Sequence, residues 1–101
     1  MSIVLIARYK NRDRHEVVRT HDEVAARINE LARSLGAVHH HVYYSEQTRE
    51  GVVIDEWQSP EGPERLFSSA EFQSALADSG MGQPDEILFL EPVSDNQALQ
   101  N

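Results

Sequence analysis

The 101-residue sequence contains no cysteine. This absence excludes disulfides, thiolate catalysis, redox sensing by thiols and cysteine-based zinc sites. The sequence also has no run approaching the ~20 apolar residues of a membrane-spanning helix, so we expect no membrane partner. Its beginning, MSIVLIARYK, lacks the basic segment and the small-residue cleavage site of a signal peptide. We therefore expect a strand there and a cytoplasmic protein.

Basic residues are few, because 9 lysines and arginines stand against 17 aspartates and glutamates, for a formal net charge of −8. Proteins that bind nucleic acid need a basic surface to displace the counterions of the phosphates, so we expect no nucleic-acid partner. The basic residues that do gather, between Tyr9 and His15, are interrupted by Asp13 and are expected to form a solvated loop. The sequence also lacks a glycine-rich phosphate loop, a dinucleotide fingerprint and a Gly-x-Ser-x-Gly nucleophile elbow.

What remains is the composition of an ordinary globular domain, with 40% apolar and 26% charged residues. A chain of this length can form one domain with a core, but not two. We therefore expect a single domain over residues 1–93 and a polar C-terminal tail, SDNQALQN, over residues 94–101.

The first part of the chain predicts a strand followed by a helix. Residues 3–9, IVLIARY, form an apolar run rich in β-branched side chains, which is typical of a strand. Residues 20–23 have the S/T-x-x-E form of a capping box and predict that the helix begins at Thr20, after a short helical lead-in. Apolar residues at helical spacing follow, and Gly36 is expected to end the helix.

Three more strands are predicted. AVHHHVYYSE over residues 37–46 and GVVIDEWQ over residues 51–58 are extended segments, and residues 47–50 are expected to join them as a hairpin. EILFLE, over residues 86–91, predicts the last strand.

A helical region is predicted between the hairpin and the last strand. Ser59 and Pro60 suit an N-cap and the first helical position, although Gly62-Pro63 can delay the helix past that turn. A second capping box over residues 68–71 then predicts a helix of ~10 residues.

The resulting order, β-α-β-β-α-β, is the ferredoxin-like α+β arrangement, with a four-stranded antiparallel sheet and two helices on one face. An antiparallel sheet with one face in water alternates apolar and polar residues. Residues 3–6, 52–54 and 87–90 are instead apolar at consecutive positions, so both sheet faces are expected to be covered. Because the helices cover only one face, we predict a homodimer that packs through the other sheet face.

The stretch AVHHHVYY places three consecutive histidines in the first strand of the hairpin. The expected loop sets His41 opposite Glu56 and His40 opposite Trp57. Side chains alternate across a strand, so His40 points to the opposite face from His39 and His41. The triplet therefore cannot act as one cluster.

Three interpretations of these histidines remain open. A metal site would combine His39 and His41 with Glu56, an accepted ligand set. A structural role would leave the rings hydrogen-bonded in the sheet or at a dimer interface. A catalytic base would be His40 or His41, oriented by Asp55 or Glu56, which would raise the pKa of the imidazole.

We predict a site built on the third interpretation, with no metal. The side chains assigned to catalysis are His40, His41, Asp55 and Glu56. The aromatic side chains assigned to the walls of the substrate pocket are Trp57, Tyr44, Phe67 and Phe72.

The strand ending in VIDEWQSPE, and the helical segment LFSSAEFQSAL, lie within a β-α-β-β-α-β chain of about one hundred residues. In these features the chain resembles the antibiotic biosynthesis monooxygenase-like family of the dimeric α/β-barrel superfamily. The resemblance covers residues 3–92 and is strongest over 38–76. The His-His pair and the Asp-Glu-Trp at the end of the next strand resemble a small bacterial branch of that family.

The resemblance implies a homodimer whose two sheets form a barrel, with a pocket in each subunit between sheet and helices. The best-understood enzymes of the family oxidise electron-rich aromatic substrates with molecular oxygen, without metal or flavin. The deprotonated substrate gives an electron to oxygen itself, so the protein supplies a base, a dry pocket and orientation. We therefore expect a cofactor-independent monooxygenase-like protein that acts on a small aromatic or polyketide-type molecule. The rival expectation is a non-catalytic dimeric protein that binds a small ligand.

Other members of the family degrade haem, and this activity is not expected here. That branch carries a second tryptophan nine residues after the one matching Trp57, and an iron-ligating histidine ten residues later. This chain has Leu66 and Leu76 at those positions, and neither side chain can distort haem or bind iron in that way.

Overall fold

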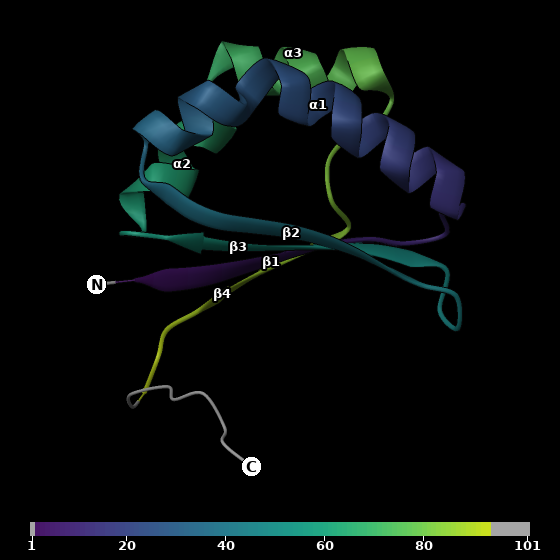
Figure 1. Cartoon of the computed structure of the whole chain (residues 1–101), viewed down its shortest axis with the longest axis horizontal. Helices are drawn as coiled ribbons and strands as arrows, with labels where there is room; N and C mark the ends of the chain where they lie inside the picture. Colours follow the sequence, from purple (N-terminus) through teal and green to yellow (C-terminus); the bar gives the residue numbers. More distant parts are fainter. Residues whose placement is uncertain (1, 94–101) are drawn as a thin grey trace.

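Four strands form one sheet in the order β2-β3-β1-β4, and all neighbouring strands are antiparallel. A computed structural model describes residues 2–93 (Figure 1). The elements along the chain are β1 (Ile3–Tyr9), α1 (Arg14–Ser34), β2 (Ala37–Ser45), β3 (Glu50–Trp57), α2 (Glu61–Ser68), α3 (Ala70–Ser79) and β4 (Glu86–Leu90). This order and pairing confirm the predicted α+β ferredoxin-like fold. Within the described residues, no helix has the length and apolar character needed to cross a membrane.

Within residues 2–93, all helices lie on one face of the sheet, and no helix covers the other face (Figure 1). Strand β1 shows the division clearly, because Ile3, Leu5, Ala7 and Tyr9 are buried while the residues between them are half-buried. The buried set packs with Trp57 and with apolar side chains from the helices to form the core. Period-two alternation therefore sends one set of side chains under the helices and the other to the open face.

Helix α1 is longer than predicted, and the predicted start at Thr20 is wrong. The helix begins at Arg14 after the extended N-cap residue Asp13. Thr20 is buried inside the helix, and its hydroxyl donates to the carbonyl oxygen of Glu16 at 2.8 Å instead of capping a terminus. The predicted helical lead-in is thus part of the same helix. The predicted stop is confirmed, because Gly36 follows the helix with a φ of 103°.

The hairpin is confirmed, but its predicted register is wrong by two residues. Ser45 pairs with Glu50 because the loop is residues 46–49, one position earlier than expected. His40 consequently lies opposite Asp55, not opposite Trp57. Between His39 and Ser45, this displacement by an even number of residues leaves every side chain of β2 on its predicted face. The pairing shifts again near Ala37, at a bulge next to the start of β2.

The predicted second helix is two helices, so residues 2–93 contain three helices. Helix α2 follows Pro60 and not Ser59. It contains Gly62 and Pro63 in its first turn, where the missing N–H of proline has no intrahelical partner to lose. Ser69 then takes an extended conformation that ends α2, and its hydroxyl oxygen accepts from the backbone N–H of Phe72 at 3.2 Å to begin α3.

The last strand agrees with the prediction, apart from ending at Leu90 and not at residue 91. The predicted tail over residues 94–101 lies outside the described part of the chain.

Helix α2 packs closely on Trp57, the most buried aromatic side chain among the described residues. Trp57 is only 1% exposed, and Gly62 lies against its indole. A Cβ atom at Gly62 would lie 2.6 Å from Trp57 Cε3 and 2.4 Å from the carbonyl oxygen of Leu35. Glycine at this position therefore allows α2 to pack directly on the tryptophan.

The first prediction concerns this contact. Gly62→Ala should lower the free energy of unfolding by about 1–3 kcal/mol, because the backbone of Leu35 and the ring of Trp57 must shift to admit a methyl group. Urea unfolding followed by tryptophan fluorescence measures the change. The exposed Arg65→Ala in the same helix is the control and should change stability little. Equal stability of Gly62→Ala and the wild type would contradict the close packing.

Candidate functional site

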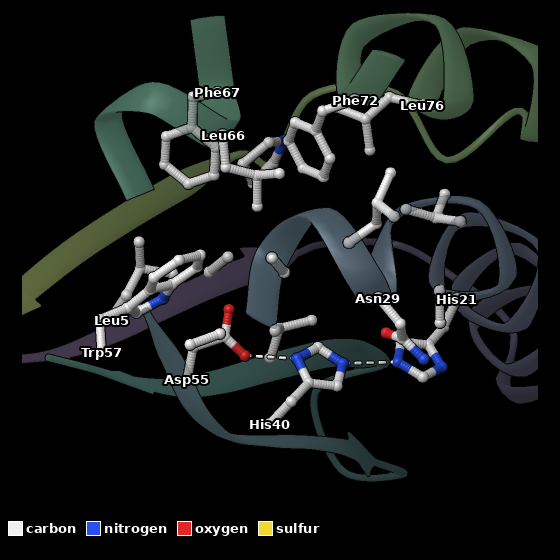
Figure 2. Close-up of a pocket in the computed structure, with 18 of the residues that line it drawn as sticks. Leu5, His21, Asn29, His40, Asp55, Trp57, Leu66, Phe67, Phe72 and Leu76 are labelled. Carbon is white, nitrogen blue, oxygen red and sulfur yellow. Dashed lines mark hydrogen bonds and ion pairs between the residues drawn. The ribbon is translucent and has the colours of Figure 1, made fainter. Parts of the chain in front are cut away.

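A cavity of about 480 Å³ lies between the helix-facing side of the sheet and the three helices. Its size falls within the range of about 300–1,000 Å³ that is usual for small-molecule sites. Figure 2 shows its two ends, with aromatic side chains from α2 and α3 above and a polar group on the strands below. The labelled side chains around it are Leu5, His21, Asn29, His40, Asp55, Trp57, Leu66, Phe67, Phe72 and Leu76.

The polar group begins with a carboxylate beneath the helices. Asp55, in β3, occupies the helix-facing side because it alternates in phase with Val53 and Trp57, and its side chain is only 15% exposed. The residue opposite it in β2 is His40, whose Nδ1 is hydrogen-bonded to Asp55 Oδ1. Two adjacent strands therefore place this acid–imidazole pair without any contribution from loops.

Asp55 changes the acid–base behaviour of the imidazole. The pKa of His40 is raised above its ordinary value, first by the hydrogen bond to Asp55 and also by the negative charge of that carboxylate, while burial acts in the opposite direction. The hydrogen bond also fixes the neutral tautomer, since Nδ1 carries the proton that the carboxylate accepts. In neutral His40 the basic nitrogen is therefore Nε2.

The structure adds a third residue that the sequence analysis did not predict, His21 of α1. Its Nε2 lies 2.6 Å from Nε2 of His40 (Figure 2). The sequence contained a signal for this position. His21 falls between Val17 and Val24 on the buried stripe of α1, so a polar ring there faces the sheet.

The opposite end of the cavity is aromatic and apolar. Phe67 of α2 and Phe72 of α3 have ring centroids 5.6 Å apart, and Trp57 closes the side next to β1. All three side chains were predicted as pocket walls, and the structure places all three at the cavity. Trp57 Nε1 is buried and has no hydrogen-bond partner within residues 2–93.

Tyr9 also lines the cavity, at the end of β1. Burial raises the pKa of Tyr9 to about 12; the charge of Arg12 acts in the opposite direction, and the charges of Asp55 and Asp85 add smaller increases. The phenol therefore stays protonated near neutral pH, so it can donate a hydrogen bond but does not act as a base.

The other predicted catalytic residues do not reach the cavity. His41 and Glu56 point to the open face of the sheet, and the predicted pairing between them is wrong. Glu56 lies opposite His39, whereas His41 lies opposite Ile54. The structure thus brings His40 and Asp55 together, but not His41 and Glu56.

Tyr44, predicted as a pocket wall, does not line the cavity either. It is on the helix-facing side of β2, but its hydroxyl donates to the carbonyl oxygen of Arg12 at 2.5 Å. The guanidinium of Arg14 lies 5.5 Å from the centroid of its ring. Tyr44 therefore packs against the segment that leads into α1.

The metal interpretation of His39, His41 and Glu56 finds no support in the geometry. Within residues 2–93, no group of three or more histidine, aspartate or glutamate side chains is arranged to hold a metal ion.

Comparison with known proteins gives matches among solved structures. A monooxygenase from the gene ActVA-Orf6 of Streptomyces coelicolor, in complex with the ligand nanaomycin D, superposes with a TM-score of 0.73 over 97% of this chain and 93% of that chain, at 18% identity. SnoaB of Streptomyces nogalater, a cofactor-independent oxygenase, gives 0.70 over 99% and 98%, at 17% identity. A Caulobacter crescentus CB15 protein provisionally assigned as an antibiotic biosynthesis monooxygenase gives 0.71 over 92% and 91%, at 18% identity.

The chain has the fold of the antibiotic biosynthesis monooxygenases. The resemblance noted in the sequence is thus confirmed at the level of the fold, which is what identities of 17–18% establish. No protein-family profile matches the chain, and no curated protein sequence matches it significantly.

The second prediction follows from the pairing of Asp55 with His40. In an NMR titration, the midpoint of His40 should lie above the ordinary imidazole value of 6.5, and Asp55→Asn should lower it. Because the folded pKa is the higher one, the stabilising contribution is fully present below the unfolded pKa of about 6.5 and is lost as pH rises through the folded pKa. The advantage of the wild type over Asp55→Asn in urea unfolding should therefore shrink on going from acid to alkaline pH.

Glu56→Gln is the matched control, because Glu56 neighbours Asp55 but points to the other sheet face. It should leave the midpoint of His40 in place. An unchanged midpoint in Asp55→Asn would contradict the assignment of Asp55 as the cause.

Proposed function

We propose that this protein is a cofactor-independent monooxygenase-like enzyme that oxidises a small aromatic or polyketide-type molecule in the cavity. The observation that carries the proposal is the His40–Asp55 pair at the edge of a cavity of about 480 Å³ whose other walls are largely aromatic and aliphatic. A flat apolar molecule with one acidic hydroxyl suits such a site, because its rings match the apolar walls and its hydroxyl matches the base.

Two of the structural neighbours support this choice of chemistry. SnoaB is described as a cofactor-independent oxygenase, and the ActVA-Orf6 monooxygenase was solved with nanaomycin D bound. In the reaction proposed here, the substrate supplies the electrons itself. Its anion transfers one electron to dioxygen, and the resulting substrate radical and superoxide combine through a new C–O bond to give a peroxide anion. The O–O bond then breaks, so that the oxygen on carbon becomes a carbonyl and the outer oxygen leaves as hydroxide with the hydrogen of that carbon. The hydroxide takes up the proton held by His40 and is released as water. We also propose that the protein is cytoplasmic.

The protein's own contribution is the proton transfer and the orientation of the substrate. His40 Nε2 accepts the proton of the substrate hydroxyl, and the electron pair of the broken O–H bond stays on the oxygen. Asp55 holds the ring in the required tautomer and stabilises the imidazolium that forms. Trp57, Phe67 and Phe72 orient the aromatic rings and keep water away from the reacting centre.

We also propose that two copies of the chain pack through the open sheet face. Ile54 and Ile6 are paired across the middle of that face, and Leu88 extends the same row on β4. Leu88 and Leu90 are 44% and 45% exposed in the single chain, next to the half-buried Val4. Covering such a face removes apolar surface from water at about 25 cal/mol per Å², which favours association.

The third prediction tests the base. With a panel of hydroquinones, the wild type should consume oxygen, and His40→Gln should lower kcat by about 10²–10⁴-fold, the usual contribution of a general base. His41→Gln is the matched control, since it changes the neighbouring residue in β2 on the other sheet face. The loss of kcat in His41→Gln should be at least tenfold smaller than the loss in His40→Gln.

Two outcomes would contradict the proposal. Equal loss of activity in both variants would mean that the imidazole in the cavity has no special role. Binding of hydroquinones without oxygen consumption would instead support the rival function, a dimeric protein that binds a small ligand.

The fourth prediction concerns the dimer. Light scattering of the wild type should give twice the chain mass of 11.5 kDa, and Leu88→Glu should give the single-chain mass because it buries a charge between the sheets. Val18→Glu is the control, since Val18 is 50% exposed on α1, away from the open sheet face. A wild type of single-chain mass, or a dimer that tolerates Leu88→Glu, would rule out this packing.

A further inference from the structure

Both ring nitrogens of His40 already have partners, which sets a condition on how any ligand can reach them. Nδ1 is hydrogen-bonded to Asp55 Oδ1, and Nε2 faces His21 Nε2 at 2.6 Å. A base must contact the proton that it accepts, directly or through one water. A ligand hydroxyl can therefore meet Nε2 of His40 only by separating the two imidazoles.

The two rings meet edge to edge. Their planes differ by only 7° and their centroids are 4.9 Å apart, while the two Nε2 atoms are much closer. The rings thus lie almost in one plane with nitrogen facing nitrogen, as Figure 2 shows. A contact of this kind requires a proton between the nitrogens, since two lone pairs would repel each other.

The carboxylates determine which ring donates. Asp55 accepts the Nδ1 proton of His40, so Nε2 of neutral His40 is an acceptor and His21 donates its Nε2–H. His21 Nδ1 also lies 3.2 Å from Asp22 Oδ1. If both carboxylate contacts are made, each Nδ1 carries a proton, and the extra proton between the Nε2 atoms gives the two rings together one positive charge.

We infer that His21 and His40 together form a binding site for an acidic hydroxyl, of the kind carried by phenols and enols, which enters between their Nε2 atoms. The inference rests on the proposed function for the class of ligand. In this site the hydroxyl donates to His40 Nε2 and its oxygen accepts from His21 Nε2–H. When the proton moves to His40, the O–H electron pair stays on the oxygen, and His21 stabilises the resulting oxyanion.

The surroundings favour movement of His21 over movement of His40. Asp55, which anchors His40, is 15% exposed and belongs to an inner strand. Asp22, the other partner of His21, is 72% exposed and adjacent in sequence, so it restrains the ring weakly. His21 can therefore turn away about its side-chain torsions while His40 keeps its orientation beside the cavity.

A metal ion held by the two nitrogens is a poorer match to the geometry. Zinc lies about 2.0–2.1 Å from each imidazole nitrogen with tetrahedral angles between its ligands. The two Nε2 atoms would then be directed at a common point beside both rings, whereas here they are directed at each other.

The fifth prediction uses 4-nitrophenol as the probe, because its ionised form absorbs at a longer wavelength than its neutral form. At a pH below the probe's own pKa, the wild type should bind it in the ionised form. His21→Gln and His21→Asn should each reduce the ratio of ionised to neutral bound probe by about 10- to 100-fold, the effect of losing one hydrogen bond to a charged group. His40→Gln should bind the probe in its neutral form. His15→Gln, an exposed histidine near the start of α1, should behave as the wild type.

A measurement on the wild type itself guards against variants that fold poorly. In NMR spectra that resolve the imidazole nitrogens, the probe should shift the Nε2 signals of both His21 and His40. A shift of His40 alone, or equal ionisation of the probe by wild type and His21→Gln, would overturn the inference. Binding of zinc chloride, but not of the probe, through both histidines would replace it by a metal site.

The same variants separate this inference from the proposed function. Oxygen consumption that depends on His40 but is unchanged in His21→Gln would overturn the two-histidine site and leave the oxygenase intact. Ionised probe held by both histidines, with no oxygen consumption from any hydroquinone, would retain the site and remove the oxygenase function.

Discussion

A carboxylate placed between a sheet and its covering helices must find a partner, because an unpaired charge in such surroundings costs several kcal/mol. Asp55 is such a carboxylate, and the imidazole of His40 on the adjacent strand is its partner. The pairing orients the ring and raises the pKa of His40. It also leaves Nε2 directed at His21, so one hydrogen bond on the sheet determines the chemistry available at the cavity.

The division of the sheet into two faces could be predicted from the sequence, because alternation along a strand is insensitive to an error of two residues in register. His40 was thus correctly placed with Asp55 and Trp57, and His41 on the other face, despite the wrong pairing. The same alternation placed Trp57 and Tyr44 on the helix-facing side of the sheet. Asp55, and not Trp57, lies opposite His40 because the hairpin loop begins one position earlier than its sequence suggests.

The remainder of the site depends on contacts that local patterns do not contain. The capping box at Thr20 was overridden because the buried stripe of α1 already includes Val17, so the helix continues through that position. In a helix that began at Thr20, His21 would lie in the first turn; in α1 it lies within the buried stripe, between Val17 and Val24. Its partner, His40, lies 19 residues away in the sequence, and only the packing of α1 on β2 brings the rings together. Tyr44 was on the predicted face but lies outside the cavity, since alternation gives a face and not a position along it.

The proposed chemistry requires that the cavity hold an aromatic ring with its hydroxyl at His40. The most direct test is a crystal structure of the protein with a redox-inert phenol bound. The ring should lie between the sheet and the side chains of Phe67 and Phe72, with its oxygen within hydrogen-bond distance of His40 Nε2. A phenol bound elsewhere, or a cavity filled by the protein's own side chains, would contradict it.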